Sequence, residues 1–171
     1  EFAQPEVERR VNAKRLAECA AAVLREVPGV TLAADSAGRL TDIAVDHSEF
    51  AHLDAARIAQ VVAVMRRHGL TATVSSIHVN GWIGAHSKWS AAQWAVRHCA
   101  GAPLDADAWL YVGDSTNDQL MFEHVPLSIA VANIGRFVSE LEVLPAYVTR
   151  GERGAGFAEV ATALIDAHRA A

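Results

Sequence analysis

The sequence predicts an α/β fold made of two units: a smaller α+β unit in the first half of the chain and part of a doubly wound parallel sheet in the second. The chain has 171 residues, about the length of one domain or of two small ones. Hydrophobic residues make up 51% of it, which is enough for packed cores and argues against disorder. Strand patterns come in hairpin-like pairs in the first half, whereas single strands alternate with helices in the second.

The first half has the predicted order α-β-β-α-β-β. Pro5 suits a first helical turn, and Pro28-Gly29 ends that helix. Asp35 to Gly38 are typical of a hairpin turn, Asp54 of a helix N-cap and Gly69 of a helix end. The expected elements are helices over 5–27 and about 54–69, and strands over 30–34, 40–45, 71–75 and 77–82. This order predicts an antiparallel sheet with helices on one face.

The pattern changes near Gly84, so we place the boundary within 82–86 and expect units over 1–84 and 85–171. The expected elements are helices over 87–99, 118–124, 136–141 and 158–168, and strands over 109–112, 127–132 and 147–149. Three short strands are few for a parallel sheet, which also needs helices over both faces. We therefore expect a further segment, most simply an N-terminal one, to complete this sheet.

Composition excludes several classes of function. The net charge is −5 and no basic run occurs, so a nucleic-acid surface is not indicated. No apolar stretch approaches the length of a membrane span, and no secretory signal opens the sequence. Cys19 and Cys99 have no metal or redox spacing, and both lie in apolar helical patterns. They are expected to be buried thiols, and the sequence predicts a cytoplasmic protein without a membrane or nucleic-acid partner.

The strongest functional signal is a turn at the end of the strand predicted over 109–112. The strand stops at Gly113, and Asp114, Asn117 and Asp118 then crowd into one turn. Ligands bind beyond the carboxyl ends of the strands in open α/β sheets. Two carboxylates in a partly buried turn need a counter-charge, and Mg²⁺ is a suitable one. The alternative is that Asp114 and Asn117 are ordinary turn residues and that Ser115 or Thr116 caps the next helix.

Several stretches of the chain resemble the haloacid-dehalogenase (HAD) superfamily of phosphohydrolases, in the branch with an α/β cap that contains sucrose-phosphatase-like and mannosylphosphoglycerate-phosphatase-like enzymes. The matching stretches are Gly113 to Asp118 with Met121-Phe122 (fourth, metal-binding motif), Ser75 to Trp82 with Ser87-Lys88 (third-motif lysine), Ile129 to Asn133, Gly154 to Phe157 (later core segments) and Thr41 to Asp46 (cap). The resemblance implies a partial Rossmann-like core with a smaller α+β cap domain.

The resemblance also implies roles for single residues. Asp114 would bind Mg²⁺ directly, and Asp118 would be a second ligand or would orient metal-bound water and the lysine. Lys88 would neutralise charge on the nucleophile and on the phosphoryl group, so Lys88 and Asp118 are the expected catalytic residues. Asn117 would hydrogen-bond the groups around the metal ion, and Asn117 and Ser115 are expected among the substrate-binding residues.

A second group of candidates surrounds the predicted boundary between the units. His78, Asn80 and Trp82, with His86 nearby, form a polar and aromatic cluster that suits a sugar or a similar polar leaving group. Alternatively, Trp82 packs the hinge and the histidines are surface residues. Asn133 would line the phosphate side of the core, or be a turn residue.

The chain departs from the family in lacking its nucleophile motif. No Asp-x-Asp followed by threonine occurs, and Asp105-Ala106-Asp107 precedes a predicted strand instead of ending one. We expect a Mg²⁺-dependent phosphomonoesterase in the intact parent, acting through an aspartyl-phosphate on a small phosphorylated metabolite such as a sugar phosphate. The expected partner of this chain is an N-terminal fragment of the same protein or a second copy.

Two other functions stay open. The first is a catalytically incomplete fragment that folds and binds without turnover. The second is a Gly-Asp-Ser serine esterase with Ser115 as the nucleophile and Asp166 and His168 as its partners.

Overall fold

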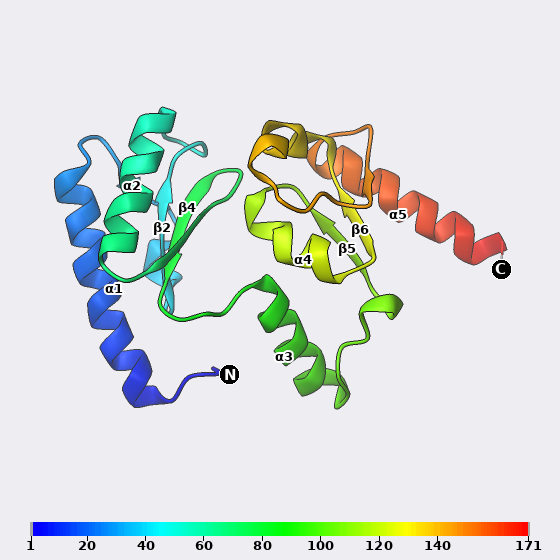
Figure 1. The fold of residues 1–171 in the computed structure, drawn as a ribbon, viewed down its shortest axis with the longest axis horizontal. Helices are drawn as coiled ribbons and strands as arrows, with labels where there is room; N and C mark the ends of the chain where they lie inside the picture. Colours follow the sequence, from blue (N-terminus) through cyan, green and yellow to red (C-terminus); the bar gives the residue numbers. More distant parts are fainter. Residues whose placement is uncertain (1, 171) are drawn as a thin grey trace. The chain divides into compact units, whose positions relative to one another are not determined.

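The computed structural model describes residues 2–170, and the chain divides into two compact units, Glu1–Ala85 and His86–Ala171 (Figure 1). The two predicted sheets are separate: residues 71–82 and residues 110–113 belong to different sheets.

Unit 1 is an antiparallel sheet with two helices on one face (Figure 1). Its elements are α1 (Glu6–Glu26), β1 (Thr31–Leu32), β2 (Asp42–Asp46), α2 (Ala55–Arg67), β3 (Thr71–Val74) and β4 (His78–Trp82). The strand order is β1-β2-β4-β3, and every neighbouring pair is antiparallel. The predicted order of elements is therefore confirmed.

The core of unit 1 lies between the sheet and the two helices. Val45 and Val79 pair across β2 and β4 and are fully buried, together with Met65 of α2. Cys19 of α1 belongs to the same core, and burial raises the pKa of its thiol to about 11. A Cβ at Gly81 would lie 2.8 Å from Met65 Sδ, so this glycine lets α2 pack closely on β4.

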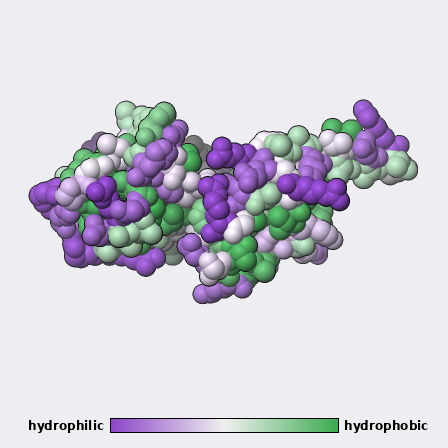
Figure 2. Space-filling model, turned by 90° about the horizontal axis from the view of Figure 1, so that it is seen from above, coloured by the Kyte–Doolittle hydropathy of each residue, from purple (hydrophilic) through white to green (hydrophobic). Residues whose placement is uncertain are grey.

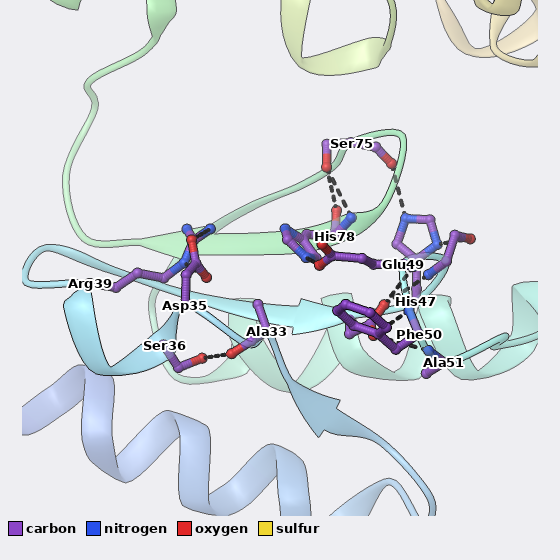
Figure 3. Close-up of polar contacts among 12 residues, drawn as sticks. Ala33, Asp35, Ser36, Arg39, His47, Glu49, Phe50, Ala51, Ser75 and His78 are labelled. Carbon is purple, nitrogen blue, oxygen red and sulfur yellow. Dashed lines mark hydrogen bonds and ion pairs between the residues drawn. The ribbon is translucent and has the colours of Figure 1, made fainter. Parts of the chain in front are cut away.

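The connection from β2 to α2 is folded around one buried carboxylate, and Figure 3 shows His47, Glu49, Phe50 and Ala51 of this connection. Asp46 is 2% exposed, and its two oxygens accept the backbone N–H groups of residues 48–51 at 2.8–3.1 Å. His47 is also buried, with Nε2 2.9 Å from the Ser75 carbonyl oxygen. His78 Nε2 lies 2.9 Å from Glu49 Oε2. These contacts tie the loop to the end of the β3–β4 hairpin.

We expect Asp46→Asn to destabilise the chain at neutral pH. The amide keeps one acceptor oxygen, so two of the four backbone N–H groups lose their partner, at a cost of about 2–4 kcal/mol in the free energy of unfolding. Urea denaturation at pH 7 measures this loss. Glu18→Gln is the control, because Glu18 is exposed and 3.9 Å from Lys14, and it should cost only a few tenths of a kcal/mol.

The same variant has a predicted pH dependence. Burial by itself would raise the pKa of Asp46, but the four backbone donors hold it below its ordinary value. The stability from this group is therefore complete above the unfolded pKa of about 3.9 and is lost as the pH falls through the lower, folded pKa. The difference between wild type and Asp46→Asn should shrink on acidification below about pH 4. An equal difference at pH 7 and pH 3 would contradict the assignment.

Unit 2 is a three-stranded parallel sheet with order β5-β6-β7, so the predicted mixed α/β class with a parallel sheet is confirmed. Its elements are α3 (Lys88–Ala100), β5 (Leu110–Gly113), α4 (Gln119–His124), β6 (Leu127–Ala130), β7 (Tyr147–Val148) and α5 (Arg153–Ala170). Phe122, Ala130 and Ile134 form its core, to which α4 contributes Phe122 and β6 contributes Ala130. None of the helices in the described part of the chain has the length and apolarity needed to cross a membrane.

Some predicted elements were wrong in type or length. Residues 136–141 are not an α-helix: 3₁₀ turns over Ala132–Arg136 and Val138–Glu140 replace it, and the tight first turn buries Ile134 in the core. The hairpin turn expected at 35–38 is instead a 3₁₀ turn over Ser36–Gly38, which lies within the longer connection between β1 and β2. The expected burial of Cys99 was also wrong: its side chain is exposed, since α3 buries none of its residues.

Candidate functional site

The predicted turn lies at the carboxyl end of β5, where the chain enters a 3₁₀ turn over Thr116–Asp118 and then α4. A Cβ at Gly113 would lie 2.8 Å from both Cγ and Oδ2 of Asp118. Only glycine therefore lets the Asp118 side chain fold back against the end of the strand. Six of the predicted site residues come together here within unit 2; they are Lys88, Asp114, Ser115, Asn117, Asp118 and Asn133.

Asp118 is the centre of this cluster, and it is 1% exposed. Its Oδ2 accepts the backbone N–H groups of Asp114, at 2.8 Å, and Ser115, at 3.1 Å. Its Oδ1 accepts Lys88 Nζ and the Tyr111 hydroxyl. Burial by itself would raise the pKa of Asp118, but the charge of Lys88 and these hydrogen bonds hold it below its ordinary value. Asp118 is thus an ionised carboxylate on which four protein donors converge.

Lys88 is the first residue of α3, and Ser87 caps that helix by accepting the Ser90 N–H at 3.2 Å. A cation is poorly placed at a helix N-terminus, and Asp118 compensates for this. Lys88 Nζ also donates to Asn117 Oδ1 at 3.0 Å. An ammonium group has three donors. Two are used by these contacts, and the side chain is 46% exposed, so the third can reach a ligand.

Asp114 is half-buried and accepts a hydrogen bond from Asn133 Nδ2 at its Oδ2, at 3.1 Å. Asn133 is 3% exposed, and its Oδ1 accepts the backbone N–H of Arg153 at 3.0 Å. That contact fixes which end of the Asn133 amide faces Asp114. Arg153 has a φ of 51°, a left-handed conformation that is uncommon for a residue other than glycine.

Ser115 lies inside the turn and is 1% exposed. Its hydroxyl donates to Asn117 Oδ1 at 2.9 Å. The partners that an esterase would require, Asp166 and His168, lie in the exposed C-terminal part of α5, where Asp166 is 4.0 Å from Arg169. This geometry gives the serine esterase alternative no support.

The other predicted site residues belong to unit 1. His78, Asn80 and Trp82 occupy alternate positions of β4, so they share one face of the sheet, opposite to the buried Val79 and Gly81. They form a row there, with His78 close to Glu49 (Figure 3).

Sequence reasoning missed two residues of the unit 2 cluster, Tyr111 and Arg153. Tyr111 carried a usable signal, because a tyrosine inside an otherwise aliphatic strand needs a partner for its hydroxyl. Arg153 acts through its backbone N–H and had no such signal.

Asp114 is the residue of this cluster that could hold a metal ion. Within residues 2–170, no group of three or more His, Cys, Asp or Glu side chains is placed to hold one. Mg²⁺ instead takes one or two carboxylates and completes its shell with water and phosphate oxygens. The half-buried Asp114 at the end of β5 meets that requirement.

No protein-family model and no curated protein matches the chain. Solved structures do match it. A protein of Thermoplasma acidophilum has a TM-score of 0.62 and 15% identity, over 87% of this chain and 60% of that one. The sucrose-phosphatase (SPP) of Synechocystis sp. PCC6803, solved with sucrose and phosphate, has a TM-score of 0.60 and 18% identity, over 86% of this chain and 64% of that one. A Plasmodium vivax protein described as a HAD/COF-like hydrolase has a TM-score of 0.50 and 20% identity, over 66% of this chain and 37% of that one.

These likenesses establish the fold. The chain has the fold of HAD-like hydrolases, a mixed α/β fold with a parallel sheet, and it spans between 37% and 64% of the length of the three similar proteins.

Proposed function

We propose that this chain carries the metal-binding and lysine-bearing part of a Mg²⁺-dependent phosphohydrolase that acts on a small phosphorylated metabolite. The observation that carries the proposal is the cluster at the end of β5, where Lys88 donates to both Asn117 and Asp118 beside Asp114. The HAD-like fold supports it, and so does the likeness to a phosphatase solved with phosphate.

The residues of this cluster would divide the work on a phosphoryl group. Lys88 would direct its third ammonium proton to a phosphoryl oxygen, and Asp118 and Asn117 would hold it there. Mg²⁺ held by Asp114 would supply further positive charge for the phosphoryl oxygens. The attacking group would be an aspartate carboxylate from a segment outside residues 1–171. Its oxygen bonds to phosphorus as the bond from phosphorus to the ester oxygen breaks, and the departing alkoxide takes a proton from water. A second water then attacks phosphorus, which frees phosphate and restores the carboxylate.

The row on β4 in unit 1, formed by His78, Asn80 and Trp82, is a second candidate for substrate binding. Trp82 offers an aromatic surface, and Asn80 and His78 offer hydrogen-bonding groups on the same face of the sheet. This combination suits a sugar or a similar polar group. A sugar phosphate is therefore the substrate class that we propose first.

The sheet of unit 2 suggests a protein partner as well. In the part of the chain that the structure describes, β5 pairs with β6 on one side only. Beside it, Leu110, Leu127 and Leu164 line a groove of about 300 Å³ between the sheet and α5. The C-terminal end of α5 projects from the unit and exposes hydrophobic as well as hydrophilic residues (Figure 2). We propose that a strand and helix from the same protein cover this edge and groove.

Size-exclusion chromatography with light scattering tests the proposed partner. The 171-residue chain alone should self-associate, because the groove and strand edge are left open to another copy. A fragment of the same protein that carries the proposed strand and helix should form a one-to-one complex with the chain. A chain that stays monomeric at every concentration and does not bind this fragment would contradict the proposal.

The two lysines of the sequence provide a matched test of the phosphoryl site. In the presence of Mg²⁺, Lys88→Met should weaken binding of inorganic phosphate by about 10–100-fold, because the variant loses one hydrogen bond between charged groups. Lys14→Met should leave binding unchanged, since Lys14 is exposed on α1. Isothermal titration calorimetry measures both, and equal phosphate affinity in the two variants would overturn the assignment.

The activity of a longer protein, one that contains this chain together with the proposed aspartate, separates a phosphatase from an esterase and from a binding module. It should hydrolyse p-nitrophenyl phosphate only when Mg²⁺ is present, and Lys88→Met should reduce turnover by at least about a hundredfold. Hydrolysis of p-nitrophenyl acetate without metal would instead indicate an esterase. Phosphate binding without any turnover would indicate a binding module.

A further inference from the structure

Tyr111 lies in the middle of β5, two residues before the glycine that ends the strand. Its ring is packed edge-on against Phe122, with centroids 6.0 Å apart and an interplanar angle of 64°. Its hydroxyl donates to Oδ1 of Asp118. This phenol therefore reaches from the strand to the buried carboxylate at the centre of the cluster.

The hydroxyl can only donate in this position. A phenol carries its proton at neutral pH, so the hydroxyl is the donor in this contact. An ionised carboxylate accepts hydrogen bonds and donates none. The contact is thus a charge-assisted hydrogen bond from a neutral donor.

Three neutral donors hold Asp118 without help from the lysine. The backbone N–H groups of Asp114 and Ser115 fix Oδ2, and the Tyr111 hydroxyl fixes Oδ1. Lys88 joins them on Oδ1 from a half-exposed position, on a long and flexible side chain. Without Tyr111, the only remaining donor on Oδ1 among these contacts would be Lys88 itself.

We propose that Tyr111 is a positioning residue, whose hydroxyl fixes the Asp118 carboxylate in the orientation that aims Lys88 at the phosphoryl group. The inference rests on the proposed function and deepens it, because it assigns the alignment of the lysine to a residue that does not touch substrate. A tyrosine that only fills space would contribute to stability and would leave the environment of Lys88 unchanged.

Tyr111→Phe tests this, and the sequence provides the controls. It has two tyrosines and two lysines, so Tyr147→Phe is the matched variant and Lys14 is the internal reference. In the chain labelled with ¹³C at lysine Cε, Tyr111→Phe should move or broaden the Lys88 signal and leave the Lys14 signal in place. Tyr147→Phe should move neither, since Tyr147 is 61% exposed. An unmoved Lys88 signal in a folded Tyr111→Phe chain would overturn the proposal.

A kinetic readout in the longer protein completes the test. Tyr111→Phe should lower kcat by about tenfold and leave KM within about twofold, as expected when an outer group that orients a catalytic residue is lost. A raised KM with unchanged kcat would overturn the positioning role. If wild type has no phosphatase activity, the proposed function fails, whereas the lysine spectrum still decides whether Tyr111 positions Lys88.

A second measurement covers the case in which Tyr111→Phe does not fold. In Tyr147→Phe, Tyr111 is the sole tyrosine, and the intensity ratio of its Raman doublet should report a phenol that donates strongly. Adding Asp118→Asn should shift that ratio towards a weaker donor. An unchanged ratio would show that the hydroxyl does not donate to Asp118, and would also overturn the proposal.

Discussion

Asp114→Asn should abolish Mg²⁺ binding and leave the fold in place. Asparagine has the same shape and keeps an oxygen for Asn133 Nδ2, but it removes the negative charge that attracts the cation. Loss of an outer partner of a metal ligand costs about 10–100-fold in affinity, so loss of the ligand itself should exceed about a hundredfold. Calorimetric titration of the chain with Mg²⁺ measures this, and turnover of the longer protein should fall in parallel.

Asp107→Asn is the control for this experiment. Asp107 is exposed, lies in a 3₁₀ turn of the same unit and carries the same charge. Its replacement should leave Mg²⁺ affinity within about twofold, since an exposed charge outside the site is largely screened. Equal loss of affinity in both variants would mean that the cation responds only to net charge, and Asp114 would then not be its ligand.

Asp118→Ala should have the largest effect on stability of any single substitution in unit 2. It removes a buried carboxylate that accepts from Lys88 Nζ, the Tyr111 hydroxyl and two backbone N–H groups. Each buried donor left without a partner, namely the phenol and the two N–H groups, costs about 1–3 kcal/mol, whereas the half-exposed Lys88 can be solvated by water. Urea denaturation should show this loss as a lower midpoint for the transition of unit 2.

Asp166→Ala provides the comparison for Asp118→Ala. Asp166 is 67% exposed and 4.0 Å from Arg169, so its removal should change the free energy of unfolding by less than about 0.5 kcal/mol. A chain that tolerates Asp118→Ala as well as Asp166→Ala would contradict the central place given to Asp118.

The fold was predictable where the sequence signals are local. Asp54 caps α2 by accepting the Arg57 N–H at 2.8 Å, and Gly69 follows that helix with a φ of 76°. Both contacts involve neighbours in sequence, so residue type and spacing reveal them. The loop around Asp46 was not predictable in this way, because four N–H groups that converge on one carboxylate leave no periodic pattern.

The candidate site, like the fold, was predictable only where its signals are local in the sequence. The turn from Gly113 to Asp118 is visible as a crowd of polar residues after an apolar strand. Lys88 precedes it by about thirty residues and was identified only through a family resemblance. Tyr111 and the amide orientation of Asn133 depend on where side chains point after packing, which spacing does not encode.

The helix that carries Lys88 has a consequence for motion. None of the residues of α3 is buried, and the Ser87 capping box secures only its first turn. Helices with few buried contacts open in local fluctuations that the rest of a domain does not share, so the amides of α3 should exchange their hydrogens with solvent well before those of β5 and β6. Each such opening would draw Lys88 away from Asp118. A phosphoryl ligand bound to Lys88 would oppose it, so ligand occupancy and the order of this helix would rise together.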